Sequence, residues 1–162
     1  MSAQTLRELL DEVVAGRQLD VPILIAVHTR QAEGSSDLTL VREEPLDWIR
    51  YTGEYGDCPF VLLGRAEAEP ARLGRSRQCE VRIDDESVSK HHATLRFDRA
   101  RGEYLVIDES SRNGTCVNGQ KLYPGEAAAI WSGAYLTLGD AVFVFIEPPA
   151  LRRLARTARS SS

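Results

Sequence analysis

Polar side chains that could bind a ligand gather in three short segments of the sequence, residues 73–76, 87–93 and 111–119. The stretches between these segments read as short strands, so the polar residues fall on strand ends and loops, where binding residues commonly lie. A guanidinium, a hydroxyl, an ammonium and an amide are supplied by Arg75, Ser89, Lys90 and Asn113. This set of donors is typical of phosphate recognition rather than of bond breaking.

A phosphorylated side chain carries about 1.5 to 2 negative charges near neutral pH and has three acceptor oxygens. Arg75 could donate two parallel N–H bonds from its planar guanidinium. Ser89 could add a short hydroxyl bond and Lys90 a point charge, and backbone amides near Ser76 or Ser89 could complete the cage. The amide of Asn113 could pair with the backbone of an extended ligand and fix its register. Gly114 would let the loop turn tightly.

Other readings of these residues compete with phosphate binding. Ser89 could cap a turn, Lys90 could be a solvated surface residue, and Asn113 with Gly114 could form a hairpin turn. Ser89 and His92 could form a nucleophile–base pair in a hydrolase, although no carboxylate is placed to orient the ring. A metal site is not expected at His91 and His92, because neighbouring side chains on a strand point to opposite faces.

Ten short strands separated by turn signals are expected after residue 59. We place them at residues 60–64, 71–75, 79–83, 92–98, 103–108, 114–117, 121–122, 127–130, 134–138 and 141–146. Asn118-Gly119 predicts a two-residue hairpin turn, in which both central positions need positive φ. Closely spaced strands without intervening helices predict an all-β fold, an antiparallel β-sandwich.

Residues 1–52 are predicted to form a separate extension of unknown role. Thr5 and Glu8 have the spacing of a capping box and start a short amphipathic helix that ends near Gly16. We expect this helix to pack on its own domain rather than on a partner. Two strands, at residues 22–28 and 38–42, would then form a small hairpin.

The sandwich itself is expected to span residues 53–149, and Pro148-Pro149 to end it. The tail, residues 150–162, contains four Arg and no acidic residue. Because chain ends are commonly disordered, we expect a basic, flexible tail. Thr157 lies among its arginines and could be a kinase substrate.

Composition excludes several classes of protein. The net charge of −4 is not arranged as a broad basic stripe, so nucleic acid is not an expected partner. No apolar run is long enough to cross a membrane, and the first residues do not resemble a secretory signal. Three widely spaced cysteines argue against disulfides and zinc and for the cytoplasm. Among the basic residues only Lys90 and Lys121 are Lys, a bias that resembles high-GC bacterial proteomes.

Taken together and in order, the motifs resemble the forkhead-associated (FHA) domain family. The resemblance covers about residues 57–147 and rests on Gly74-Arg75, on Ser89-x-x-His92 and on Ser111-x-Asn113-Gly114-Thr115-x-x-Asn118-Gly119. It implies an eleven-stranded β-sandwich whose loops bind phosphothreonine peptides. The phosphopeptide-binding residues it implies are Arg75, Ser89, Lys90, Arg112 and Asn113. The loop-supporting residues it implies are Gly74, Ser76, His92, Gly114 and Asn118.

The resemblance also implies a function and partners. We expect a non-catalytic adaptor that binds a phosphothreonine-bearing protein in a Ser/Thr kinase pathway and needs no cofactor or metal. Self-association through a phosphorylated threonine such as Thr157 is a further expectation. The alternative is a phosphate-independent scaffold that acts through residues 1–52, where Trp48, Ile49 and Tyr51 form a bulky patch.

Overall fold

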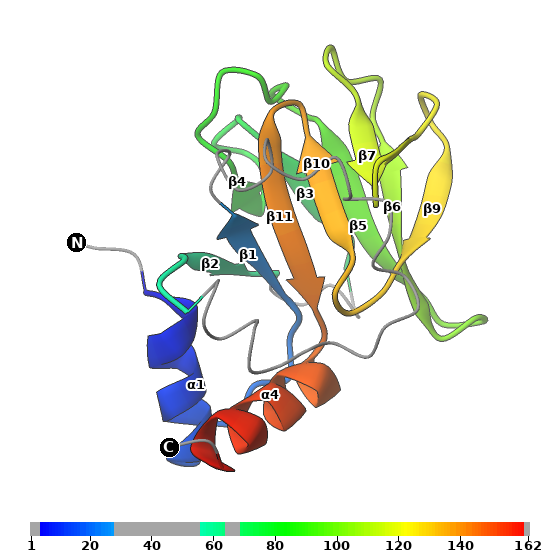
Figure 1. Cartoon of the computed structure of the whole chain (residues 1–162). Helices are drawn as coiled ribbons and strands as arrows, with labels where there is room; N and C mark the ends of the chain where they lie inside the picture. Colours follow the sequence, from blue (N-terminus) through cyan, green and yellow to red (C-terminus); the bar gives the residue numbers. More distant parts are fainter. Residues whose placement is uncertain (1–3, 28–55, 64–68, 161–162) are drawn as a thin grey trace.

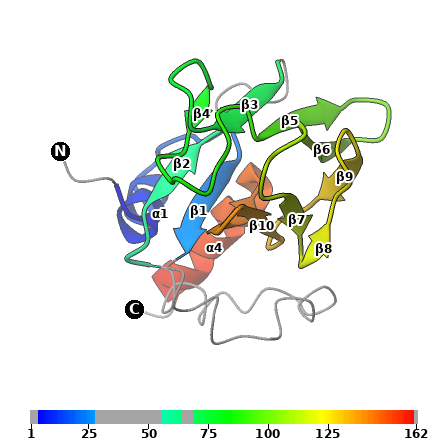
Figure 2. The ribbon, with the colours of Figure 1, turned by 90° about the horizontal axis from the view of Figure 1, so that it is seen from above.

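The computed structural model of this protein describes residues 4–27, 56–63 and 69–160. Two β-sheets form the body of the molecule, and two helices lie together at one end of it (Figure 1). Viewed down onto the opposite end, the helices lie beneath the sheets (Figure 2). Among the described residues, no helix is long and apolar enough to cross a bilayer.

The first sheet has six strands in the order β2-β1-β11-β10-β7-β8, and all its pairs are antiparallel. Its strands are β1 (Ile23–Val27), β2 (Phe60–Leu62), β7 (Thr115–Val117), β8 (Gln120–Lys121), β10 (Tyr135–Leu138) and β11 (Ala141–Ile146). The turn between β7 and β8 has positive φ at both central residues, 50° at Asn118 and 80° at Gly119. The predicted hairpin is confirmed.

The second sheet has five strands in the order β4-β3-β5-β6-β9. Its strands are β3 (Ala71–Gly74), β4 (Val81–Arg82), β5 (Ala93–Asp98), β6 (Glu103–Asp108) and β9 (Ala127–Ile130). The pairs are antiparallel except β3 with β4, which run parallel. The all-β sandwich is thus confirmed, with one parallel pair that the sequence pattern did not reveal.

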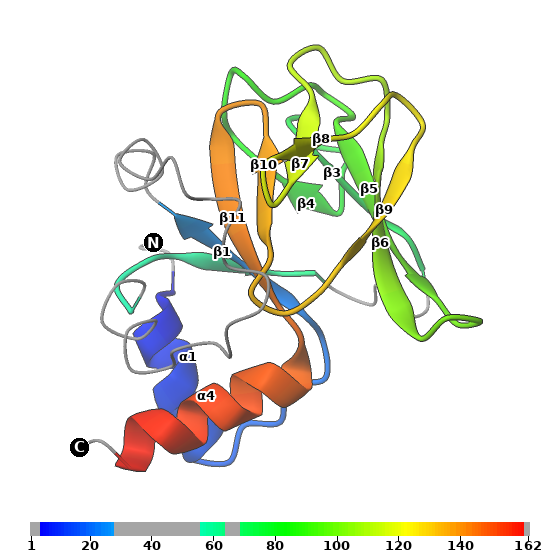
Figure 3. The same ribbon diagram turned by 45° about the vertical axis from the view of Figure 1, so that its right-hand side comes forward.

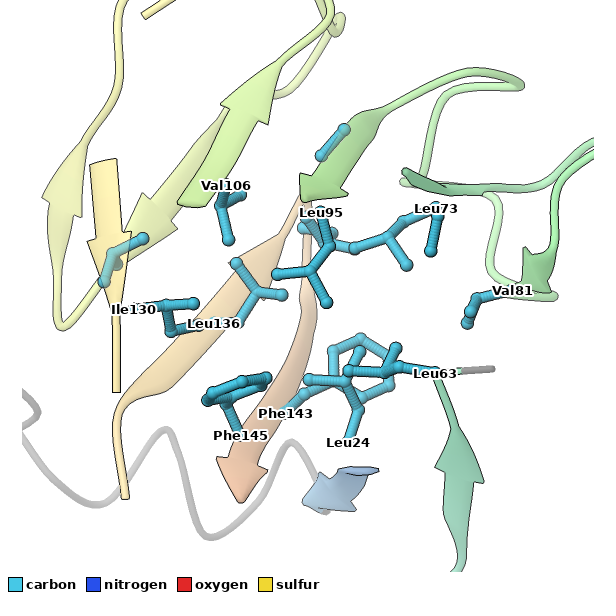
Figure 4. Close-up of a cluster of buried hydrophobic side chains, with 14 of the residues drawn as sticks. Leu24, Leu63, Leu73, Val81, Leu95, Val106, Ile130, Leu136, Phe143 and Phe145 are labelled. Atoms are coloured by element: carbon cyan, nitrogen blue, oxygen red, sulfur yellow. The ribbon is translucent and has the colours of Figure 1, made fainter. Parts of the chain in front are cut away.

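The core lies between the two sheets and is made of alternate residues on facing strands. Leu73, Leu95 and Val106 from one sheet meet Leu136 and Phe145 from the other, and all are almost fully buried (Figure 4). Each strand turns every second side chain inward, so the strand spacing fixes which residues reach the core. This packing gives the rigid body from which the loops project.

The first helix, α1 (Leu6–Val14), begins as the sequence predicts. Thr5 Oγ1 accepts the Glu8 N–H at 3.4 Å, and a Glu8 carboxylate oxygen accepts the Thr5 N–H at 2.8 Å. Leu6 and Leu9 are completely buried in a second apolar cluster on the molecule. The helix therefore packs on its own domain, as expected.

The predicted flexible tail is wrong, because residues 148–160 form helix α4 (Pro148–Ser160). Two prolines in the first turn are compatible with a helix, since those N–H groups have no intrahelical acceptor. Ala150, Leu151, Leu154 and Ala155 follow at helical spacing and are buried against α1 and the sheet. The apolar stripe, which the prolines obscured, explains why this basic segment is ordered.

The predicted N-terminal hairpin also needs correction, because β1 is an inner strand of the six-stranded sheet. It pairs with β11 from Ile23 opposite Ile146 to Val27 opposite Val142, and with β2 on its other side. Its run of apolar residues reflects burial on both faces: Leu24 faces the sandwich core, and Ile23 and Ile25 face the helices. The strand expected at residues 38–42 and the patch at residues 48–51 lie outside the described residues.

Candidate functional site

Three loops meet at the end of the sandwich opposite the helices (Figure 3). They are the β3–β4 loop (residues 75–80), the β4–β5 loop (residues 83–92) and the β6–β7 loop (residues 109–114). The β10–β11 turn at Gly139 joins them, since its N–H donates to the Gly114 carbonyl at 3.1 Å. The five binding residues expected from the sequence all lie on these three loops.

Arg75 is anchored to the neighbouring β4–β5 loop by two hydrogen bonds. Its backbone N–H donates to the Ser89 carbonyl at 3.0 Å, and its side-chain Nε donates to the Val88 carbonyl at 3.1 Å. These bonds hold the half-buried side chain in place and leave the two terminal nitrogens of the guanidinium for a ligand. An arginine fixed in this way loses little side-chain entropy when it binds an anion.

Gly74 and Ser76 support this anchoring by letting two loops approach closely. A Cβ at Gly74 would lie 2.2 Å from the carbonyl oxygen of Lys90, so no larger residue fits without moving the backbone. The same carbonyl accepts the Ser76 N–H at 3.1 Å and the thiol of Cys79 at 3.2 Å. Burial raises the pKa of the Cys79 thiol, which keeps it a neutral donor. Lys90 itself is exposed.

Ser89 connects the β4–β5 loop to the β6–β7 loop. Its Oγ accepts the backbone N–H of Arg112 at 3.0 Å. Because a hydroxyl has one donor and two acceptor positions, this bond leaves the Ser89 hydrogen available to a ligand. Ser89 and Arg75 lie at the same end of the molecule, joined by the bond from the Arg75 N–H to the Ser89 carbonyl at 3.0 Å.

His92 is completely buried and holds two of the loops together. Its Nδ1 accepts the Ser89 N–H at 3.0 Å, so the ring proton lies on Nε2, which donates to the Gly114 carbonyl at 2.8 Å. The ring thus contacts the backbone of Ser89 and not its hydroxyl. This arrangement lacks the nucleophile–base contact that the hydrolase alternative needs.

Asn113 reaches across from the β6–β7 loop to the β4–β5 loop. Its Nδ2 donates to the Ser87 carbonyl at 2.8 Å, which leaves the side-chain oxygen and a second N–H exposed. Ser87 is itself held by Asp85 Oδ1 at 2.7 Å and by the Asp140 N–H at 2.8 Å. A side-chain amide fixed in this way can still pair with the backbone of an extended ligand. The role of Ser87 had no signal in the sequence, because its partners lie on distant loops.

A buried carboxylate at the end of β6 shapes the β6–β7 loop. Asp108 Oδ1 accepts the hydroxyls of Ser111 at 2.5 Å and Thr115 at 2.7 Å, and Ser111 Oγ in turn accepts the Gly114 N–H at 3.1 Å. Gly114 has φ of +90°, a conformation that glycine adopts readily. Sequence reasoning missed Asp108, which reads as an ordinary acidic strand end.

Asn118 supports the fold at some distance from these contacts. Its side-chain oxygen accepts the Tyr135 N–H at 2.9 Å, and its own N–H donates to the Tyr135 carbonyl at 2.9 Å. These bonds fix the β7–β8 hairpin to β10. Asn118 is therefore a hairpin residue in this structure.

The loop end carries cations whose charge is not neutralised within the described part of the chain. Arg75, Lys90 and Arg112 form no ion pair with any described residue. A group of three or more potential metal ligands is likewise absent from the described residues. The site offers fixed hydrogen-bond donors and positive charge, which together suit an anionic ligand.

The comparison that decides the family is the match of residues 71–139 to the family model of the FHA domain. The chain contains an FHA domain. The matched segment runs from β3 to the β10–β11 turn and so includes all three loops described above. The resemblance inferred from the sequence motifs is confirmed.

Curated relatives match this chain over part of their own length. The angiogenic factor with G patch and FHA domains 1 of Mus musculus is 44% identical over 55 residues, which are 33% of this chain and 8% of that protein. The oxoglutarate dehydrogenase inhibitor of Corynebacterium glutamicum is 35% identical over 77 residues, 48% of this chain and 50% of that protein. The chain thus spans half or less of these relatives.

Solved FHA domains share the fold. The N-terminal FHA domain of S. cerevisiae Rad53p, solved in complex with a phosphothreonine peptide, is 19% identical to this chain, with a TM-score of 0.50. The comparison covers 82% of this chain and 98% of that one. At this level of identity the likeness concerns the fold.

Proposed function

We propose that the FHA domain of this chain binds phosphothreonine-bearing proteins and acts as a non-catalytic adaptor. The observation that carries the proposal is the convergence of Arg75, Ser89 and Asn113, from three separate loops, on one end of the sandwich. Arg75 and Ser89 would bind the phosphate, with Lys90 and Arg112 adding charge beside it. Asn113 would bind the peptide backbone.

The energetics support a ligand anchored by a single phosphate. A hydrogen bond to a charged group contributes about 1.5–3 kcal/mol, so three such bonds anchor a peptide without a deep apolar pocket. The loops are already linked to each other by Arg75, Ser89 and His92. The loops therefore lose little conformational entropy when a ligand binds, which favours high affinity.

We place this adaptor in the cytoplasm, downstream of a Ser/Thr kinase. Cys58, Cys79 and Cys116 are all free, which fits a reducing compartment. Phospho-dependent self-association remains part of the proposal, although Thr157 now falls in α4 and its side chain lies outside the described residues. Preference for phosphothreonine over phosphoserine would need a small pocket for one methyl group.

The scaffold alternative, acting through residues 1–52, loses part of its motivation. The apolar stripe of α1 is buried inside the molecule against α4 and the sheet, so it is not presented to a partner. β1 is committed to the six-stranded sheet in the same way. The Trp48–Tyr51 patch lies outside the described residues.

The test is a titration of a fluorescent phosphothreonine peptide with the wild-type chain and two matched arginine variants. Arg75→Ala removes at least two charge-assisted bonds, about 3 kcal/mol, and should weaken binding about 100-fold. Arg99→Ala is the control, because exposed Arg99 follows β5 at the end of the sheet away from the loops. Equal affinity of the two variants, or equal binding of the unphosphorylated peptide, would reject the proposal.

A further inference from the structure

A hollow of about 370 Å³ lies beside the β6–β7 loop, on the side of Gly114 that carries the β7–β8 hairpin. Arg112, Gly114, Lys121 and Tyr123 line it, together with Asp108 and Ser111. Arg112 belongs both to this hollow and to the phosphate-binding loops, since its N–H is bonded to Ser89 Oγ. The hollow is therefore next to the proposed phosphate position.

Lys121 is positioned in this hollow by its strand and by the missing side chain of Gly114. On β8 it is paired opposite Cys116, which fixes its backbone. A Cβ on Gly114 would lie 2.8 Å from Lys121 Cε and 3.5 Å from Lys121 Nζ. The side chain of Lys121 thus lies across Gly114, with its ammonium close to this glycine. Gly114 directly follows Asn113 in the chain.

The positive charge in this hollow is not used inside the described structure. Neither Lys121 nor the side chain of Arg112 forms an ion pair or hydrogen bond with a described residue. Asp108, the only acid among the residues that line the hollow, is 2% exposed, and its two oxygens accept bonds from Ser111 and Thr115. Asp108 is buried, whereas Arg112 and Lys121 are exposed.

Tyr123 also lines the hollow and is 75% exposed, the most exposed large hydrophobic residue described. Pro124 follows it and stiffens that wall. A ligand side chain entering here would lie against an aromatic ring, with its charged end between Lys121 and Arg112. Tyr123 belongs to neither apolar cluster, so the packing of the core does not account for an aromatic ring at this position.

We propose that this hollow is a second anion subsite of the FHA domain, which binds a further negatively charged side chain of the same phosphopeptide. Its ligand is a carboxylate or a second phosphate placed a few residues from the phosphothreonine. Lys121 and Arg112 bind that anion, and the ring of Tyr123 packs on its aliphatic part. The inference rests on the proposed function, because it concerns a second contact of the same ligand.

The experiment uses alanine-based peptides that contain one phosphothreonine and one scanned position, from four residues before it to four after. At the scanned position each peptide carries alanine, glutamate or phosphoserine. Affinities are measured for the wild-type chain, for Lys121→Gln and for Arg99→Gln, which removes the same charge at the far end of the sheet. Thermal unfolding of each variant verifies that it is folded.

At one or two neighbouring positions, glutamate or phosphoserine should improve wild-type affinity about fivefold over alanine, as expected for one exposed ion pair. Lys121→Gln should abolish that gain and leave the alanine peptide unaffected, while Arg99→Gln should keep it. A larger gain with phosphoserine identifies a second phosphate as the natural ligand, and an equal gain identifies an acidic side chain.

Two outcomes separate this inference from the function on which it rests. If the wild-type chain binds the alanine peptide but no scanned position gives a gain that depends on Lys121, the subsite does not exist and the function stands. If the wild-type chain binds none of the phosphopeptides, both ideas are rejected.

Discussion

Replacing His92 tests whether the binding loops are held by one buried ring. His92→Ala leaves the Ser89 N–H without its acceptor, whereas the Gly114 carbonyl keeps the bond from Gly139. One unsatisfied buried donor costs about 1–3 kcal/mol, and the space left by the ring adds to that. We expect the free energy of unfolding to fall by about 3 kcal/mol, which lowers Tm by about 6–12 °C in a chain of this size.

His91→Ala is the matched control, because it also removes a histidine, but one that is exposed. The contact that the described structure shows for the His91 side chain is a long one, 3.8 Å from its Nδ1 to the Cys79 sulfur. His91→Ala should change the free energy of unfolding by less than about 0.5 kcal/mol. Urea unfolding followed by tryptophan fluorescence measures both variants, and peptide titration below Tm measures their affinity. Because His92 sets the position of Ser89, His92→Ala should also bind phosphopeptide more weakly while still folded. Equal stability of the two variants would refute the argument that the ring joins the loops.

Three further changes test other parts of the structure. Leu154→Ala should lower the free energy of unfolding by about 2–5 kcal/mol, because this fully buried side chain fixes α4; a change below about 1 kcal/mol in urea unfolding would show that the helix is not packed. Gly74→Ala should weaken phosphopeptide binding, since its Cβ would clash with the Lys90 carbonyl and separate the two loops; unchanged affinity by titration would contradict the close approach. The hydrogen bond from the Arg72 guanidinium lowers the pKa of Glu80 to about 2. The small stabilisation that the Arg72–Glu80 pair gives the folded state is therefore present above about pH 4.5 and is lost as pH falls toward 2. Arg72→Ala should raise that pKa toward its ordinary value in a carboxyl NMR titration, and an unmoved pKa would exclude the pair.

Local sequence patterns predicted most of the elements that carry the site. Strands β6, β9 and β11 begin and end where alternation and turn residues predict, and the capping box at Thr5 starts α1 as expected. These features depend on a few adjacent residues, so the sequence shows them directly. The residues that the motifs mark as binding residues lie on loops at one end of the sandwich. The sequence could indicate this because each motif directly adjoins a predicted strand.

Features that depend on distant partners could not be predicted in this way. Helix α4 was missed because two prolines and many arginines obscure its apolar stripe, and only α1 and β1 explain why that stripe is buried. Asp108 and Ser87 act through bonds to other loops, and neither has a local pattern that distinguishes it. The pairing of β1 with β11 joins opposite ends of the sequence, which alternation alone does not specify.

That pairing has a consequence for how the protein is made. β1 lies between β2 and β11 in the sheet. Ile23 pairs with Ile146, so β1 has no β11 partner until nearly the whole chain has been synthesised. Contacts this remote in sequence form slowly, so a nascent chain exposes an apolar strand for most of its synthesis. Fragments that end before β11 should therefore aggregate, even though they contain all three loops that we propose to bind the phosphate.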